Sequence, residues 1–257
     1  MLRRLGKGAG FAFRVASYIL TTLVGRLLIR SDHHRRVFAL NRLSICSRWA
    51  LKGLDVQVRA VKFPLLRSDR THFFVANHVS DVDILAVASL APMIFITSVE
   101  LRDLSLLGTL ARLGGCVFVE RRNKFKVMEE MEHLVQLMRD GFDVLLFAEG
   151  TSSNGEGVLP FKNTLIQAAI DAEAVLVPVC INYIAIDGQA PGPGNRDKVY
   201  YYGDMGFTAH LWRLLGARSI VLECRFLEPI PLTRSDERKE MCERVYRMVV
   251  ENYKPAR

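Results

Sequence analysis

Short apolar runs alternate with helical patterns from residue 54 to the end of the chain, and this alternation constrains the fold more than any other feature. The runs are rich in Val, Ile and Phe, as is typical of strands that are buried on both faces. A chain that alternates such strands with helices forms a sheet against which the connecting helices pack. We therefore predict an α/β fold, with a mixed, largely parallel sheet covered by helices on both faces.

The element boundaries follow from the periodicity and from the turn residues between the runs. Strands are expected at residues 55–61, 72–76, 93–97, 116–120, 142–148, 175–182, 199–202 and 219–226. Helices are expected at residues 84–90, 101–113, 125–139, 164–172, 207–215 and 234–253, the last after a Thr233-x-x-Asp236 capping box. Pro178 lies inside a strand-like run, and since proline cannot donate to a ladder, it predicts an edge strand or a bulge there.

The first 52 residues differ from the rest of the chain in charge. They contain 11 Lys and Arg residues and a single Asp, a net charge of +10, whereas the remaining residues contain 24 basic and 26 acidic side chains. A basic segment on a nearly neutral body indicates an anionic partner for that segment. Nucleic acid and anionic lipid would both fit, and the apolar content of the segment favours lipid. We expect residues 1–52 to form a basic amphipathic two-helix membrane-association motif and residues 53–257 to form an α/β catalytic domain.

Residues 11–29 are apolar enough to mimic a membrane-spanning helix. Arg14 and Arg26 leave only residues 15–25 uninterrupted, 11 residues, whereas a span needs ~20. Residues 33–51 have the pattern of a second amphipathic helix. We predict a helical hairpin in the membrane interface, with basic groups toward the headgroups and Leu, Phe and Trp below them. Two alternatives stay open, a pair of core helices in a soluble fold and a signal-anchor helix that spans the bilayer.

The five cysteines are widely spaced and include no CxxC pair. An odd number of scattered cysteines indicates neither a disulfide framework nor a zinc site, so a reducing compartment is expected. Most of them lie in apolar runs, where a free cysteine acts as a small buried hydrophobic residue. Together with the basic hairpin, this predicts a monotopic or peripheral protein on the cytoplasmic face of a membrane.

The segment NHVSDVD, residues 77–83, directly follows the apolar run HFFVA. His78 would project from the end of a strand, and Asp83, five residues later, could fold back onto its imidazole. The functional interpretation makes His78 a general base whose tautomer Asp83 fixes. Asp81 competes with Asp83 for that role. The structural interpretation is a Ser80-x-x-Asp83 capping box that begins the next helix without any catalysis, and the two interpretations are compatible.

Two further segments could bind an anion. FAEGTSSNGEGVLPFKNTL, residues 147–165, leaves a strand through a turn rich in Gly, Ser and Thr, which presents backbone N–H groups, with Glu149 at its start and Lys162 after it. GCVFVERRNK, residues 115–124, is an apolar strand that ends in Arg121 and Arg122, and paired arginines can grip a phosphate. An ordinary loop and two surface arginines are the structural alternatives.

Taken in order, these segments resemble the glycerolipid acyltransferase family, in particular its lysophosphatidic acid acyltransferase (PlsC-like) group. The resemblance covers residues 73–182 and includes the PFK sequence at residues 160–162. The matching residues are His78 and Asp83 (NHxxxxD), Gly115, Phe118 and Arg121 (GxxFxxR), Glu149, Gly150 and Thr151 (EGT), and Pro178 (apolar-Pro). The implied fold is an α/β domain behind an N-terminal two-helix membrane motif.

The resemblance implies an acyl transfer from acyl-CoA or acyl carrier protein to the free hydroxyl of a lysolipid at a membrane surface. In this expectation His78 is the base and Asp83 orients it, without any metal or any cofactor beyond the acyl donor. The first expected acceptor is 1-acylglycerol-3-phosphate, which would give phosphatidic acid. The residues that would bind substrate are Arg121, Glu149, Gly150, Thr151 and Lys162.

Ser152 departs from the pattern of family members that act on lysophosphatidate, because an arginine usually follows their EGT block. The departure leaves the acceptor open, and lyso-ornithine lipid is the alternative. Two functional rivals are also open: a non-catalytic membrane-surface binding protein and a hydrolase of acyl thioesters. Nucleic acid is not an expected partner.

Overall fold

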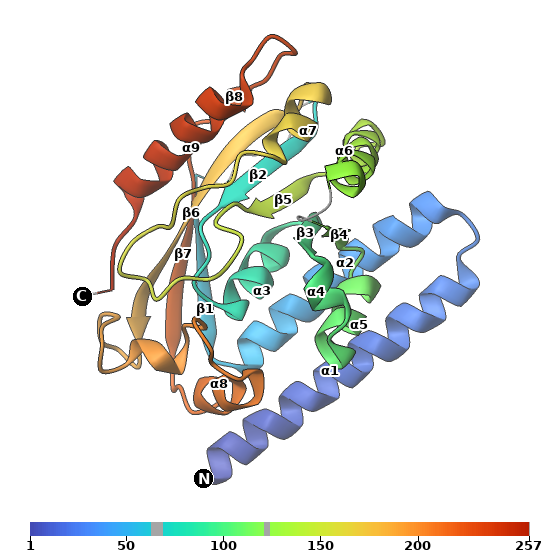
Figure 1. Ribbon diagram of the computed structural model, residues 1–257. Helices are drawn as coiled ribbons and strands as arrows, with labels where there is room; N and C mark the ends of the chain where they lie inside the picture. Colours follow the sequence, from blue (N-terminus) through green and yellow to red (C-terminus); the bar gives the residue numbers. More distant parts are fainter. Residues whose placement is uncertain (63–68, 121–123, 257) are drawn as a thin grey trace.

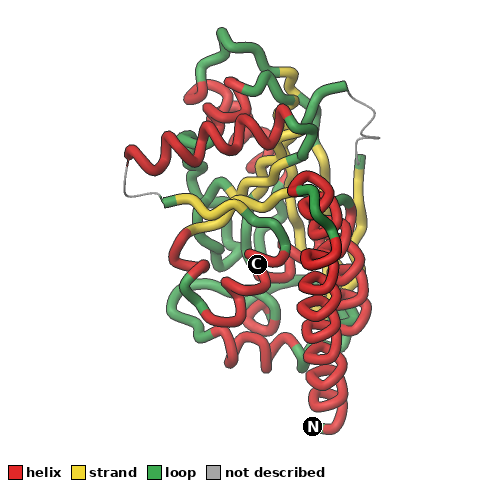
Figure 2. Tube along the Cα trace, turned by 90° about the vertical axis from the view of Figure 1, so that its right-hand side faces the viewer, coloured by secondary structure: helices red, strands yellow, loops and turns green. Residues whose placement is uncertain are grey.

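The computed structural model describes residues 1–62, 69–120 and 124–256 (Figure 1). The chain begins with two long helices, α1 (Leu2–Leu28) and α2 (Asp32–Gly53), that run side by side along one flank of the molecule (Figure 2). Ser31 caps α2, since its side chain accepts a hydrogen bond from the N–H of His34. The expected helical hairpin is therefore present, and α1 begins nine residues earlier than the apolar pattern indicated.

The described strands form one mixed sheet of the predicted class. The strand order is β1-β7-β6-β2-β5-β3-β4, with β8 also paired to β6. The β6–β7 and β6–β8 pairs are antiparallel and the other neighbours are parallel. The strands are β1 (Val56–Val61), β2 (His72–Ala76), β3 (Ile94–Ser98), β4 (Val117–Val119), β5 (Val144–Phe147), β6 (Val175–Ile186), β7 (Ile220–Phe226) and β8 (Ile230–Pro231).

Helices cover both faces of this sheet. Successive side chains of each strand point to opposite faces, so one strand contributes to the core on either side. Phe74 and Ala76 of β2 join the core beneath α2 and α3 (Asp81–Leu90), whereas Phe73 and Val75 join the core beneath α6 (Lys124–Arg139), α7 (Ile166–Asp171) and α9 (Arg238–Asn252). The remaining helices are α4 (Val99–Arg102), α5 (Ser105–Leu113), the single 3₁₀ turn η1 (Arg196–Lys198) and α8 (Phe207–Leu214).

Residues 199–202 do not form the expected strand. Val199 and Tyr200 are buried nevertheless, because the segment is a loop that packs against the residues that follow β2. The N–H of Tyr200 donates to Arg196 O (2.8 Å) and the N–H of Tyr201 donates to Val79 O (2.9 Å). Apolar residues that are buried in a loop have the same sequence pattern as a buried strand, so the strand prediction at residues 199–202 is wrong.

Two helix predictions also need correction. The helix expected at residues 101–113 is two helices, α4 and α5, and the chain between them folds back so tightly that a Cβ on Gly108 would lie 2.2 Å from Arg102 O. The last helix begins at Arg238 instead of residue 234. Asp236 accepts from the N–H of Thr233 (2.6 Å) and so closes a turn, while Glu237 caps the helix by accepting from the N–H of Glu240.

Pro178 lies in an interior strand, neither at an edge nor at a bulge. Strand β6 pairs with β2 on one side and with β7 and β8 on the other, and Pro178 falls between the β8 pairing at Leu176 and the β7 pairing at Val179. Its carbonyl accepts from the N–H of Leu227 on the β7/β8 side. Because the N and O of one strand residue point to the same side, its missing N–H costs no bond to β2.

Three of the five basic residues of α1 donate hydrogen bonds to the rest of the protein, so for these three the expectation that they face headgroups is wrong. Arg3 donates to Asp55 (2.8 Å), Lys7 donates to Ala217 O (2.7 Å), and Arg26 donates to Arg112 O (2.6 Å). The opposite side of α1 is apolar and exposed along its whole length. Its large exposed side chains are Leu2, Leu5, Phe13, Leu20, Leu23, Val24, Leu27 and Leu28.

Candidate active site

The candidate site lies at the carboxyl end of the central strands. β2 lies between β5 and β6, and all three strands are parallel, so their carboxyl ends meet at one edge of the sheet. His78 follows the last residue of β2 by two positions, and α3 begins at Asp81. Asn77 fixes the end of β2 against β6, since its amide donates to Ile181 O (3.0 Å) and accepts from Ile181 N–H (2.7 Å).

Asp83 orients His78. Its Oδ2 accepts from His78 Nδ1–H (2.9 Å) and from the backbone N–H groups of Val79 (2.8 Å) and Ser80 (2.9 Å). Its Oδ1 accepts from the hydroxyl of Tyr183 (2.7 Å), and the side chain is fully buried. Every contact comes from a donor, so the carboxylate acts only as an acceptor. This arrangement fixes the imidazole in the Nδ1–H tautomer and would stabilise the imidazolium.

His78 keeps Nε2 available for chemistry. Its ring stacks on Phe147 at the end of β5, with ring centroids 4.2 Å apart and an interplanar angle of 20°. Within the described residues Nε2 has no hydrogen-bond partner, and the side chain is 15% exposed. A ring held on one face by an aromatic side chain and on one nitrogen by a carboxylate presents the Nε2 lone pair in a fixed direction. The site can therefore remove a proton from a hydroxyl group that approaches Nε2.

The capping box and the orienting role of Asp83 are both present. Ser80 Oγ accepts from Val82 N–H (3.2 Å) and donates to Val199 O (2.5 Å), and helix α3 begins with the reciprocal Ser80 and Asp83 contacts. A single carboxylate thus begins the helix and contacts the imidazole, so the capping interpretation is confirmed, and the role of His78 as a general base stays a prediction.

Asp81 does not orient His78. It has no hydrogen bond to the imidazole, and its Oδ2 is buried without a partner among the described residues. Burial raises the pKa of Asp81 to about 6, and the nearby His78 opposes this rise. Asp83 is therefore the orienting residue.

Glu149 holds the site together through the backbone. Its Oε1 accepts from His78 N–H (2.6 Å) and its Oε2 accepts from Leu159 N–H (2.7 Å), so the carboxylate links the end of β2 to the 147–165 segment. Burial raises the pKa of Glu149 to about 7, although the two backbone hydrogen bonds oppose this rise. A direct contact between Glu149 and substrate stays a prediction, and its structural role is evident.

The rest of the 147–165 segment folds close against His78. Ser153 N–H donates to His78 O (2.9 Å), and Ser152 Oγ donates to Tyr201 O. Thr151 is exposed at the start of this loop. A small cavity of about 60 Å³ is lined by Gly150, Lys162 and Phe147, and the ring of Phe147 stacks on the ring of His78.

The predicted phosphate site is described only in part, because Lys162 is placed by the structure and the paired arginines are not. Lys162 is exposed, and its Nζ makes no hydrogen bond or ion pair within the described residues. Arg121 and Arg122 lie outside the described residues, so their role stays a prediction. Two contributors were missed by sequence reasoning, Tyr183 and Phe147. Both lie in continuous apolar strands, where no spacing singled them out.

Comparisons with known proteins relate the chain to acyltransferases. A family model described as Acyltransferase matches residues 60–182. The lyso-ornithine lipid O-acyltransferase of Brucella abortus is 36% identical over 174 residues, which are 65% of each chain, so the chain spans just under two thirds of that relative. The 1-acyl-sn-glycerol-3-phosphate acyltransferase of Neisseria meningitidis is 30% identical over 206 residues, 79% of this chain and 78% of the relative.

The fold is also that of a solved structure. The 1-acyl-sn-glycerophosphate acyltransferase PlsC of Thermotoga maritima matches with a TM-score of 0.69 and 21% identity over 98% of this chain and 95% of its own. That likeness supports the fold, whereas the sequence matches carry the relationship. The chain belongs to the acyltransferase family of the PlsC type.

Proposed function

We propose that this protein transfers a fatty acyl group from a thioester to the free hydroxyl of a lysolipid. The observation that supports the proposal is the imidazole of His78, held at Nδ1 by Asp83 and unpartnered at Nε2 among the described residues. His78 Nε2 accepts the hydroxyl proton while the hydroxyl oxygen attacks the thioester carbonyl. The tetrahedral intermediate then expels the thiolate, which takes the proton from the imidazolium. An ester and a free thiol result, and a positioned base contributes about 10² to 10⁴ to the rate.

The acyl donor in this proposal is acyl-CoA or acyl carrier protein, and the chemistry needs no further cofactor. The first acceptor we propose is 1-acylglycerol-3-phosphate, which would yield phosphatidic acid. It is supported by the exposed Lys162 beside Gly150, because a lysine ammonium is a suitable partner for a phosphate.

Lyso-ornithine lipid is the second candidate acceptor, and Ser152 favours it. The hydroxyl of Ser152 already donates a hydrogen bond to Tyr201 O. Ser152 therefore does not supply the phosphate contact of the arginine that usually follows EGT in enzymes acting on lysophosphatidate. Relatives named for this acceptor are also among the most similar proteins.

We further propose that α1 lies in the interface of the membrane on its cytoplasmic side. By length and composition α1 could cross a bilayer, and only 17% of its most apolar window is buried in the protein. However, the same helix is tied to the α/β domain at both ends, through Lys7 and Arg26. To cross the bilayer the helix would have to break these contacts with the globular domain, whereas its apolar exposed face can enter one leaflet while they stay intact.

The test is a mass-spectrometric assay of the purified protein with mixed lysolipids and both donor types, combined with a measurement of thiol release. The proposal predicts a new diacyl lipid together with thiol, and the acceptor consumed identifies the headgroup. Thiol release without lysolipid, and without a diacyl product, would identify a thioester hydrolase instead. An absence of thiol release across all donors and acceptors would identify a non-catalytic membrane-surface protein.

A further inference from the structure

The segment that follows α9, residues 253–256, lies against the loop of the 147–165 segment (Figure 1). Gly155 O in that loop accepts two hydrogen bonds from it, one from the hydroxyl of Tyr253 (2.9 Å) and one from the N–H of Ala256 (2.9 Å). Ala256 is also buried, so the contact is packed as well as hydrogen-bonded. The acyl-transfer chemistry proposed above does not use these contacts.

Asn182 fixes the position of this segment relative to the sheet. Its side chain is fully buried in β6, where Oδ1 accepts from the N–H of Lys254 (2.8 Å) and Nδ2 donates to Asn252 O (3.1 Å). The next residue of β6 is Tyr183, whose hydroxyl donates to Asp83. One strand therefore holds both the segment after α9 and the carboxylate that orients the imidazole, so the segment has a defined position relative to the catalytic residues.

The same loop also contacts the catalytic centre. Ser153 N–H, two residues before Gly155, donates to His78 O (2.9 Å). Gly155 has a φ of +79°, which favours glycine, and a Cβ at this position would lie 2.1 Å from Cε2 of the buried Tyr200 ring. The backbone at Gly155 thus packs closely on Tyr200 while its carbonyl is held by the segment after α9. A shift of Gly155 would move the neighbouring turn that contacts His78.

We propose that Tyr253 is a positioning residue for acyl transfer: through Gly155 it holds the turn at residues 151–153 in the conformation that binds the headgroup of the lysolipid. The proposal rests on the lysolipid acylation proposed above. Residues 148–165 form neither a helix nor a strand, and a loop of this length loses conformational freedom, at a cost, when a ligand has to order it. Hydrogen bonds from a segment that is fixed to β6 order the turn before the lysolipid arrives, which removes that cost from binding.

The decisive variant is Tyr253→Phe, which removes the hydroxyl and keeps the ring. The loss of one hydrogen bond changes the population of the ordered turn by up to about five-fold, and the apparent affinity falls with that population. KM for the lysolipid should therefore rise about two-fold to five-fold. Both kcat and KM for the acyl donor should change by less than about two-fold, because His78 keeps its contacts with Asp83 and Glu149. Hydrogen exchange at Ser153 N–H should become faster, because the turn opens more often.

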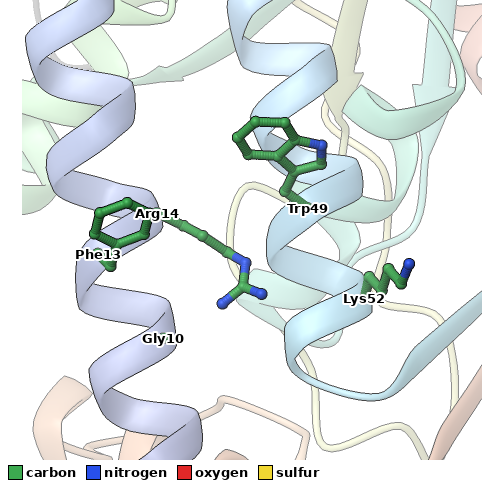
Figure 3. A pocket seen from close by; sticks show the side chains of 5 residues that line it. All are labelled: Gly10, Phe13, Arg14, Trp49 and Lys52. Atoms are coloured by element: carbon green, nitrogen blue, oxygen red, sulfur yellow. The ribbon is translucent and has the colours of Figure 1, made fainter.

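The matched control is Tyr18→Phe, which removes another hydroxyl–carbonyl hydrogen bond, from Tyr18 to Leu110 O (3.4 Å). Tyr18 lies on α1, which runs beside α2 (Figure 3), on the flank of the molecule opposite to the 253–256 segment (Figure 1). This variant should leave KM for the lysolipid unchanged. Both variants are assayed in detergent micelles with 1-acylglycerol-3-phosphate and with lyso-ornithine lipid, and urea unfolding is measured on the same samples.

A rise in the lysolipid KM for Tyr253→Phe but not for Tyr18→Phe supports the positioning role. An unchanged lysolipid KM in Tyr253→Phe, or an equal rise in both variants that follows their loss of stability, would overturn it. Unchanged exchange at Ser153 in Tyr253→Phe would also overturn it, and exchange is measured without substrate. A wild-type protein that forms no diacyl lipid from either acceptor would instead overturn the proposed function, so the two failures are distinguishable.

Discussion

Replacement of Asp83 by asparagine separates the two roles of this side chain. The amide oxygen of Asn can take the place of Oδ2 and accept from the same three N–H groups, while the amide nitrogen can donate to the Tyr183 oxygen. The number of hydrogen bonds is then unchanged, so the free energy of unfolding should fall by only about 1 kcal/mol. The negative charge beside the forming imidazolium is lost, however. For charge centres about 4 Å apart this costs about 4 kcal/mol at an effective dielectric constant of about 20, or about 10³ in rate.

The assay is kcat/KM for thiol release from the acyl donor in the presence of lysolipid, with urea unfolding measured on the same samples. Asp83→Ala is the comparison, because it leaves two buried backbone N–H groups and the Tyr183 hydroxyl without an acceptor and should destabilise the fold by several kcal/mol. An activity loss below about ten-fold for Asp83→Asn would refute the electrostatic role and leave Asp83 as a helix cap.

Three further predictions follow from the contacts of the site. Tyr183→Phe removes one of the four donors to Asp83 and should lower the free energy of unfolding by about 1 kcal/mol in urea titrations, with a smaller activity loss than Asp83→Asn. Burial raises the pKa of Glu149 from 4.5 to about 7, so over that range the folded chain holds a proton that the unfolded chain has released. The free energy of unfolding should therefore fall as pH rises through this window, by at most about 3 kcal/mol, and Glu149→Gln should abolish that part of the fall. Asp81→Ala should retain acyl transfer in the thiol-release assay, since Asp81 makes no hydrogen bond to His78; a loss as large as that of Asp83→Asn would reassign the orienting role.

Local sequence patterns predicted the part of the site that local contacts build. The five-residue spacing of His78 and Asp83 and the capping box at Ser80 involve neighbouring residues, and the structure contains both. Tyr183 lies 100 residues from Asp83 in the chain, and only the pairing of β6 beside β2 brings its hydroxyl to the carboxylate. Such a contact leaves no periodic signal in the sequence.

The same distinction holds for the fold and the helical hairpin. The alternation of apolar runs predicted the sheet class, but an apolar run at residues 199–202 is buried as a loop, and Pro178 fits an interior strand because its partner changes there. The basic charge of residues 1–52 was evident from composition, whereas the direction of each side chain was not. Lys7 and Arg26 are used to dock α1, because carbonyl groups of the α/β domain happen to lie within their reach.

The central claim is that His78 acts as the general base of acyl transfer, and His78→Ala tests it most directly. The measurement is the rate of diacyl lipid formation by wild-type protein and variant, with thermal unfolding as a check on the fold. The account predicts that the variant is folded, with a single thermal unfolding transition, and that its transfer rate is lower by a factor of about 10² or more. Transfer by His78→Ala at close to the wild-type rate would contradict it.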